Sequence, residues 1–227
     1  MNKINTMICA ACAFVLVSVG ASVKADSDNF AGPYIGLSAS AYGVSAKGKS
    51  HTGHDNVSGV GINNVTVGKV AGVTGGEVGY AIPIGSRFLV DFGISALTGQ
   101  AQIEVEGDDV GSENVQFHID DLVTYYISPQ LVLSDTSALY VKIGLTEGDT
   151  GVVGDVTTPG KLSGSTWGIG LRTVLDSGIF IRSEAGFTEY NGLSASGKGS
   201  SGGIANTNNY SAELDSAYGM FSMGMRF

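Results

Sequence analysis

The sequence is poor in cysteine and has few long apolar runs, and both absences narrow the choice of fold. Its only cysteines, Cys9 and Cys12, lie near the start, so the chain beyond them offers no disulfide, thiol nucleophile or thiolate metal site. After residue 25, no apolar stretch reaches the roughly 18 residues that a transmembrane helix needs, which excludes a helical membrane protein. Charged residues make up only 15% of the chain. An apolar chain without a long apolar run is typical of alternating β-strands.

The first 25 residues have the pattern of a secretory signal peptide. Lys3 provides a basic start, residues 7–20 are an apolar run, and the segment ends on the small residue Ala25. The apolar run is too short for a membrane span. We therefore expect residues 1–25 to be removed and residues 26–227 to form one domain.

Basic charge is also scarce. The formal net charge is −9, and loss of Lys3 and Lys24 with the signal segment would make it two units more negative. This balance argues against a nucleic-acid partner and against docking to lipid through a polybasic surface.

Eight segments alternate between apolar and small or polar residues, which is the period of a β-strand. In the last of them, Phe221, Met223, Met225 and Phe227 share one face of the strand. The eight segments lie at about 34–41, 70–81, 88–96, 123–133, 139–145, 167–171, 179–187 and 217–227. The alternation slips near Gly99, where we expect a glycine bulge. The pattern predicts an all-β fold, a single eight-stranded antiparallel barrel.

The connections between these segments alternate in length. Short turns are expected at 83–87, 134–137 and 176–178, and long loops at 44–64, 106–114, 148–165 and 191–210. Segregation of this kind is typical of a transmembrane barrel with short periplasmic turns and long extracellular loops.

Four acids break the apolar face, and all four lie at the long-loop ends of their strands: Asp121, Glu147, Glu189 and Asp215. Below them, stretches of seven to twelve residues carry no charge at the apolar-facing positions. A tilted strand needs ~9–11 residues to cross the hydrocarbon. The apolar face is therefore expected to meet lipid, with the acids above the bilayer.

Aromatic residues fit two girdles at the membrane boundaries. Tyr80, Phe88 and Phe227 are expected near the short-turn rim, and Trp167 and Phe187 near the long-loop rim.

Residues 30–38 (FAGPYIGLS) resemble the opening strand of the small outer-membrane barrels of the OmpA/OmpX-like superfamily. The strand ending in Phe227 resembles the signal read by the outer-membrane assembly machinery, and Tyr190, which closes the strand over 180–187, is also familiar from that group. The resemblance implies a barrel in the bacterial outer membrane. Its expected partners are outer-membrane lipid, lipopolysaccharide and the assembly machinery.

Seven charged residues have the parity of the barrel interior: Glu77, Asp91, Lys142, Arg172, Arg182, Glu184 and Arg226. The lumen of an eight-stranded barrel is filled by its own side chains, and buried charges there must be paired. We interpret the set as a structural salt-bridge network. The alternative is a polar conduit or gate.

No residue pattern in the sequence indicates a catalytic site, a cofactor site or a metal site. His118 and Asp120 share a face, as in some outer-membrane enzymes, but eight strands are fewer than the protease family has and no His-x-Ser motif occurs. His51 and His54 lie in a glycine-rich stretch that would have to be ordered before it bound a metal. Six acids of the expected long loops are interpreted as residues that keep these loops in contact with water, with divalent-ion binding as the alternative: Glu106, Asp108, Asp109, Glu147, Asp149 and Asp155.

The sequence therefore predicts an outer-membrane barrel with a structural or surface-interaction role, a filled lumen, no enzymatic activity and extracellular partners for its long loops. A narrow porin-like channel for small solutes or ions is the alternative function. A third interpretation is a soluble periplasmic barrel, similar to a lipocalin, with its apolar face turned inward.

Overall fold

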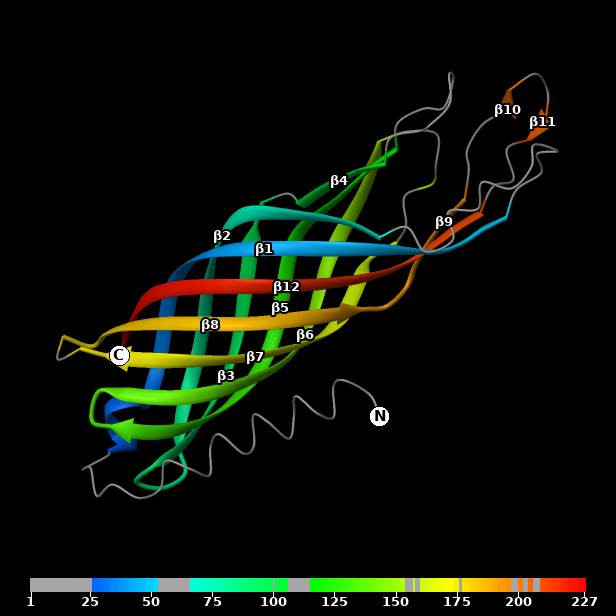
Figure 1. The fold of residues 1–227 in the computed structure, drawn as a ribbon. Helices are drawn as coiled ribbons and strands as arrows, with labels where there is room; N and C mark the ends of the chain where they lie inside the picture. Colours follow the sequence, from blue (N-terminus) through cyan, green and yellow to red (C-terminus); the bar gives the residue numbers. More distant parts are fainter. Residues whose placement is uncertain are drawn as a thin grey trace.

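The structure is a computed structural model that describes residues 26–52, 66–99, 101–105, 115–153, 157, 160–175, 177–196, 200–201, 204–205 and 209–227. The expected signal peptide lies outside these residues. A short 3-10 helix, η1 (Ser27–Phe30), precedes the strands. The strands are β1 (Gly32–Thr52), β2 (Thr66–Pro83), β3 (Phe88–Thr98), β4 (Ala101–Val105), β5 (Val115–Ser134), β6 (Ser137–Val153), β7 (Leu162–Val174), β8 (Ile179–Tyr190), β9 (Leu193–Ser196), β10 (Ser200–Ser201), β11 (Ile204–Ala205) and β12 (Asn209–Arg226) (Figure 1).

Eight of these strands form a closed antiparallel wall. The order is β1-β2-β3-β5-β6-β7-β8-β12, and pairing of β1 with β12 closes the ring. The closing seam is continuous, because Tyr34 pairs with Arg226 at one end and Lys47 with Glu213 near the other. The predicted eight-stranded barrel is confirmed. Among the described residues, no helix is long and apolar enough to cross a membrane.

The two faces of the wall differ in the way that the alternation predicts. Leu37 and Phe227 point outward and are 76% and 71% exposed, whereas Arg172 and Tyr140 point inward and are at most 1% exposed. A soluble lipocalin-like barrel would place the apolar face inside. The observed orientation contradicts that third interpretation.

The register slips by one residue around Gly99, as the expected bulge requires: Leu97 pairs with Leu122 and Ala101 with Ile119, so four steps on this side face three on β5. β3 ends at Thr98, Gly99 has a φ of +139°, and β4 begins at Ala101. Glycine tolerates this backbone conformation because it has no Cβ. β4 is hydrogen-bonded to β5 alone, so the wall changes its pairing at this point.

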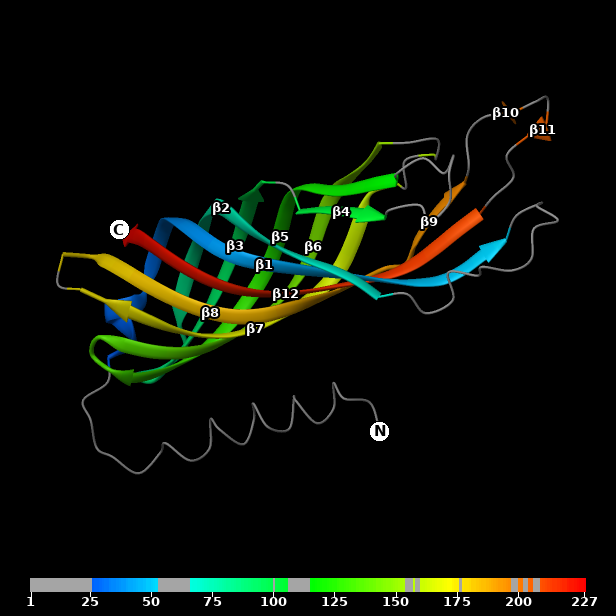
Figure 2. The same cartoon turned by 45° about the horizontal axis from the view of Figure 1, so that its top comes forward.

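Several strands extend into segments that we expected to be loops. β1 continues to Thr52 and β6 to Val153, so the expected loops at 44–64 and 148–165 both begin as strands. The side-chain alternation fades there, but backbone hydrogen bonding to a formed neighbour does not require it. The expected loop at 106–114 lies outside the described residues. Figure 2 shows β1, β12 and β9 running beyond the body of the barrel.

The short-turn end is covered by η1. Phe30 is fully buried, the Ser27 amide donates to the carbonyl of Ser86 (3.0 Å), and the Asn29 side-chain amide donates to the carbonyl of Asp135 (3.2 Å). These contacts attach the start of the described chain to two different turns, β2–β3 and β5–β6, and so close that end of the barrel.

Candidate functional site

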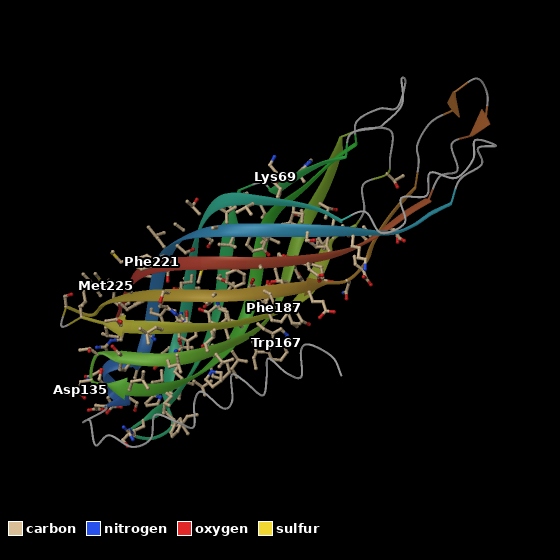
Figure 3. All side chains as sticks on the ribbon, viewed as in Figure 1. Lys69, Asp135, Trp167, Phe187, Phe221 and Met225 are labelled. Atoms are coloured by element: carbon tan, nitrogen blue, oxygen red, sulfur yellow. The ribbon has the colours of Figure 1, made fainter. Side chains whose placement is uncertain are left out.

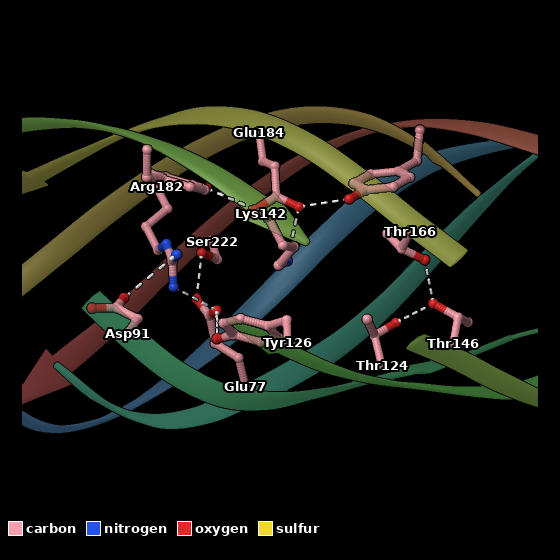
Figure 4. Close-up of polar contacts among 12 residues, drawn as sticks. Glu77, Asp91, Thr124, Tyr126, Lys142, Thr146, Thr166, Arg182, Glu184 and Ser222 are labelled. Carbon is pink, nitrogen blue, oxygen red and sulfur yellow. Dashed lines mark hydrogen bonds and ion pairs between the residues drawn. The ribbon is translucent and has the colours of Figure 1, made fainter. Parts of the chain in front are cut away.

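Six of the seven charged residues expected inside the barrel lie buried in the lumen: Glu77, Asp91, Lys142, Arg172, Arg182 and Glu184. They come from β2, β3, β6, β7 and β8, and they are three acids and three bases. Figure 4 shows how most of them meet across the lumen. The set is balanced in charge, which lowers the cost of placing it in a low-dielectric interior.

The Glu184 carboxylate accepts three hydrogen bonds. Its Oε1 accepts hydrogen bonds from Lys142 Nζ (2.8 Å) and from the Tyr218 hydroxyl (2.7 Å), and its Oε2 accepts from the Tyr140 hydroxyl (2.8 Å). Lys142 Nζ also lies 4.5 Å from the centre of the Tyr126 ring. The carboxylate is therefore satisfied on both oxygens, as a buried charge must be.

Glu77 forms the second centre. Arg182 Nη1 donates to Glu77 Oε2 (3.0 Å), and the Tyr126 hydroxyl donates to the same oxygen (3.2 Å). Ser222 Oγ donates to Oε1 (2.8 Å). The Arg182 guanidinium also lies 4.4 Å from the centre of the Tyr140 ring. Aromatic rings and carboxylates thus hold this cation from different sides.

Arg172 and Asp91 form the third contact. Arg172 Nη1 lies 3.6 Å from Asp91 Oδ2, and Arg182 Nη2 lies 3.8 Å from the same oxygen. The Arg172 guanidinium lies 4.9 Å from the Tyr34 ring and 4.8 Å from the Phe180 ring. Arg172 is therefore held by an ion pair and two ring faces.

Arg226 is the charged residue that the structure separates from this network. Its Nη1 donates to the carbonyls of Ala31 (3.2 Å) and Asp28 (3.4 Å) at the short-turn rim. Its parity matches the interior, but the last strand has reached the end of the barrel by this position. Arg226 thus holds η1 and the residue after it, and does not contact a buried carboxylate.

Sequence reasoning missed a ladder of threonine hydroxyls. Thr124, Thr146, Thr166 and Thr188 bond in series across β5, β6, β7 and β8, with 2.8 Å between the first two and between the last two. The signal was available: each is a threonine at an inward position. Only the register shows that Thr124 pairs with Thr146 and Thr166 with Thr188, and that Thr146 lies diagonally across from Thr166.

Two apolar clusters enclose the polar middle of the lumen. The cluster at the long-loop end comprises Tyr42, Val44, Val73, Ile119, Leu122, Leu162, Tyr190 and Leu214. The cluster at the short-turn end comprises Phe30, Tyr34, Ala81, Leu89, Val132, Ala138, Val174 and Phe180. Inward glycines make room for the large rings: a Cβ at Gly170 would lie 2.4 Å from the Tyr140 ring, and one at Gly93 2.5 Å from Tyr126. The lumen is therefore a packed core.

The other candidate residues are dispersed. His118 Nε2 lies 3.3 Å from Asp120 Oδ2, and both side chains are partly exposed. Glu147 and Asp149 are exposed on β6. The His51 side chain, His54, Glu106, Asp108, Asp109 and Asp155 lie outside what the structure describes. Within the described part of the chain, no three histidines, cysteines or acids gather to hold a metal ion.

The acids that break the apolar face lie where the lipid-facing wall ends. Glu147, Glu189 and Asp215 are exposed and outward. Asp121 is also exposed, with a φ of +49°, and lies where the β5–β6 register shifts between Asp120 and Val123. The shift therefore coincides with the change from the apolar wall to the projecting strands.

A closed antiparallel barrel with an apolar exterior and a charged, filled interior defines an outer-membrane β-barrel protein. Residues 9–221 match the family described as "Outer membrane protein beta-barrel domain", and the chain belongs to this family. Its location is the bacterial outer membrane. No curated protein matches the chain.

Solved structures resemble the fold at low sequence identity. The outer membrane protein OprG from Pseudomonas aeruginosa is 12% identical, with 91% of this chain and 99% of that chain covered and a TM-score of 0.56. Ail, the attachment invasion locus protein of Yersinia pestis, crystallised with a heparin analogue, is 11% identical, with 86% and 99% covered and a TM-score of 0.45. At these identities the likeness to OprG supports the fold alone.

Proposed function

We propose that this outer-membrane barrel has a structural or surface-interaction role, does not carry solutes through its lumen and does not act as an enzyme. The observation that carries the proposal is the layered filling of the lumen. Two apolar clusters enclose three ion-paired contacts, and the buried cations also contact aromatic rings. A solute would have to displace both apolar layers and break buried ion pairs, and breaking such a pair costs about 3–5 kcal/mol.

A cavity in the lumen lies beside the threonine ladder. Its volume is about 20 Å³, and its lining includes the four threonines of the ladder, Lys142 and Tyr218. A volume of that size is close to what one water molecule requires. It supports a sealed interior rather than the narrow porin-like channel.

The projecting strands support the surface role. β2 stops pairing with β1 at Lys47, but β1 continues with β12 until Thr52 faces Asn209. β9 pairs with β12 over Asn209–Ala212 and adds a third strand. We infer that this projection contacts extracellular partners, while lipid and lipopolysaccharide surround the wall below. Phe227, which is exposed at the end of the last strand, would carry the signal for the assembly machinery.

Conductance in planar bilayers tests the sealed lumen. Barrel refolded in detergent, with a porin as the incorporation control, is expected to give no stepwise current above the bare bilayer. Regular ohmic steps from heat-modifiable, folded protein would refute the closed lumen and support the channel instead.

The surface role has its own test. Replacing residues 48–65 and 193–212 by short turns is expected to lower cell–cell or cell–host adhesion of expressing bacteria, because it removes the projecting parts of β1, β9 and β12. Outer-membrane levels should not change, since the wall is intact. Equal adhesion at equal surface levels would refute the surface-interaction role.

A further inference from the structure

Four buried polar side chains in the lumen lack a hydrogen-bond partner among the described residues. Asp91, Ser128 and Arg172 are 0% exposed, and Gln130 is 2% exposed. Within the part of the chain that the structure describes, no side-chain nitrogen or oxygen atom of these four residues donates or accepts a hydrogen bond. We refer to them as the unpartnered group. Buried polar atoms nearly always have a partner, either in the protein or in ordered water.

The unpartnered group lies in one place. Asp91 on β3 pairs directly with Ser128 on β5, and Gln130 lies two residues further along β5 on the same inward face. Arg172 reaches the group from β7, with its Nη1 3.6 Å from Asp91 Oδ2, and Arg182 Nη2 lies 3.8 Å from the same oxygen (Figure 4). Both distances suit an ion pair but are too long for a hydrogen bond. The charges are therefore compensated while the hydrogen bonding is incomplete.

The backbone beside the unpartnered group is interrupted as well. The β5–β6 ladder stops after Ile127 and resumes at Gln130 in the same register, and between these described strands Ser128 and Pro129 form no pair. Proline has no backbone N–H to donate, which accounts for the interruption. Buried backbone groups that lose a ladder partner are satisfied by side chains or by ordered water. The side chains and the ladder are independent observations, and both indicate missing hydrogen-bond partners at the same place.

The charge of the lumen disfavours an ion as the missing partner. The buried network holds three acids and three bases, so an added ion would be an uncompensated charge in the interior. The group also needs both kinds of partner, because the Arg172 guanidinium only donates, the Asp91 carboxylate only accepts, and the Gln130 amide does both. The partner is therefore neutral, and it both donates and accepts hydrogen bonds.

The unpartnered group is enclosed toward the short-turn end. Two residues of the apolar cluster at that end lie directly beside it: Leu89 pairs with Gln130, and Ala138 pairs with Arg172. Figure 3 shows Asp135, whose carbonyl accepts a hydrogen bond from η1, at this end of the barrel. A solute would have to displace both η1 and the cluster to reach the group from this side. The partner is therefore small and is enclosed when the barrel folds.

We propose that ordered water molecules bind within the unpartnered group and are part of the folded barrel. One accepts a hydrogen bond from the Arg172 guanidinium and donates to the Asp91 carboxylate. Others bridge the Gln130 amide, the Ser128 hydroxyl and the backbone beside Pro129. Buried waters of this kind typically make about three hydrogen bonds each to polar groups that have no other partner. The proposal goes beyond the function proposed above and does not depend on it, because enclosed water carries no current.

The Gln130 side-chain amide and the Arg172 Nε–H are the reporters for this site. Deuterated barrel with labelled nitrogen is refolded into detergent micelles, and magnetisation transfer from water is measured by NMR in the laboratory and rotating frames. The ratio of the two transfer rates distinguishes bound water from proton exchange. Transfer with the sign of bound water is expected at both reporters. The control is the backbone amide of Val132, which is buried in the apolar cluster, donates to the carbonyl of Arg87 and should show no transfer.

Two variants test whether the unpartnered group holds the water. Gln130→Leu removes both polar atoms of the amide and is expected to weaken the transfer at Arg172 severalfold. Ser128→Ala is a smaller change and is expected to weaken the transfer at Gln130. The matched control is Thr188→Val, which removes a buried hydroxyl from the threonine ladder and should leave both reporters unchanged. Heat-modifiable mobility of every variant verifies folding before the spectra are compared.

Absence of transfer at both reporters in the folded barrel would overturn the proposal, because the side chains would then satisfy one another directly. Equal transfer in the wild-type barrel, Gln130→Leu and Ser128→Ala would also overturn it. Titration with chloride and bromide provides a further test: if the Arg172 Nε–H resonance shifts with halide concentration, the site holds an anion and the proposal fails. Stepwise conductance would refute the sealed lumen alone, since the transfer measurement reports on bound water in either case.

Discussion

Replacing Lys142 by methionine removes the cation 2.8 Å from Glu184 and leaves that carboxylate buried in the lumen. Losing one partner of a buried pair typically costs 3–5 kcal/mol. Tyr140 and Tyr218 still donate to Glu184, so we place the loss in the free energy of unfolding near the lower limit, at about 3 kcal/mol. The loss is large beside the usual effect of a single substitution, about 1 kcal/mol.

The double variant Lys142→Met, Glu184→Gln separates ion pairing from packing. The glutamine carbonyl oxygen still accepts from a tyrosine and carries no charge, so the double variant should recover about 2 kcal/mol of the loss. Reversible urea unfolding from lipid vesicles measures all three proteins and the Glu184→Gln single variant. A Lys142→Met loss below about 1 kcal/mol, or a double variant no more stable than Lys142→Met, would refute the account of the lumen as a charge-compensated core.

Further predictions concern the lipid-facing side chains, the C-terminus, the short-turn end that η1 covers, and the closure of the barrel. Ile169→Arg places a basic side chain on the lipid face and should cost about 2–4 kcal/mol in the same unfolding assay, without rescue by any interior change. Deleting Phe227 should leave the chain in the periplasm, whereas Arg226→Gln should still assemble; fractionation of cells distinguishes the two, and unchanged outer-membrane levels without Phe227 would show that it carries no assembly signal. Phe30→Ala empties a fully buried site beneath the barrel and should cost about 3–5 kcal/mol, with thermal unfolding as the measurement. The intact barrel should migrate differently in boiled and unboiled gel samples, because a closed sheet leaves no edge for detergent to open; identical mobility would argue against closure.

The sequence by itself determined which way each side chain points. A strand turns successive residues to opposite faces, so the parity of Ile169 and Arg172 separated lipid from lumen before any pairing was known. The same parity assigned seven charged residues to the interior, of which six are buried in the lumen, and it indicated that they must compensate one another. Segregated loop lengths and the terminal Phe227 were equally local signals, and they sufficed for the class of protein.

Only the tertiary structure decided which residues meet. Arg172 on β7 reaches Asp91 on β3, strands that are not neighbours in the wall, and parity gives no height along the barrel axis. Arg226 has the interior parity but lies beyond the end of the lumen, where it donates hydrogen bonds to the carbonyls of Asp28 in η1 and of Ala31. Gly72 on β2, Ala41 on β1 and Gly219 on β12 likewise become neighbours only through the register of their three strands. Side-chain direction follows from the geometry of one strand, whereas partners follow from the register and closure of all eight, and each register depends on hydrogen bonds between distant segments.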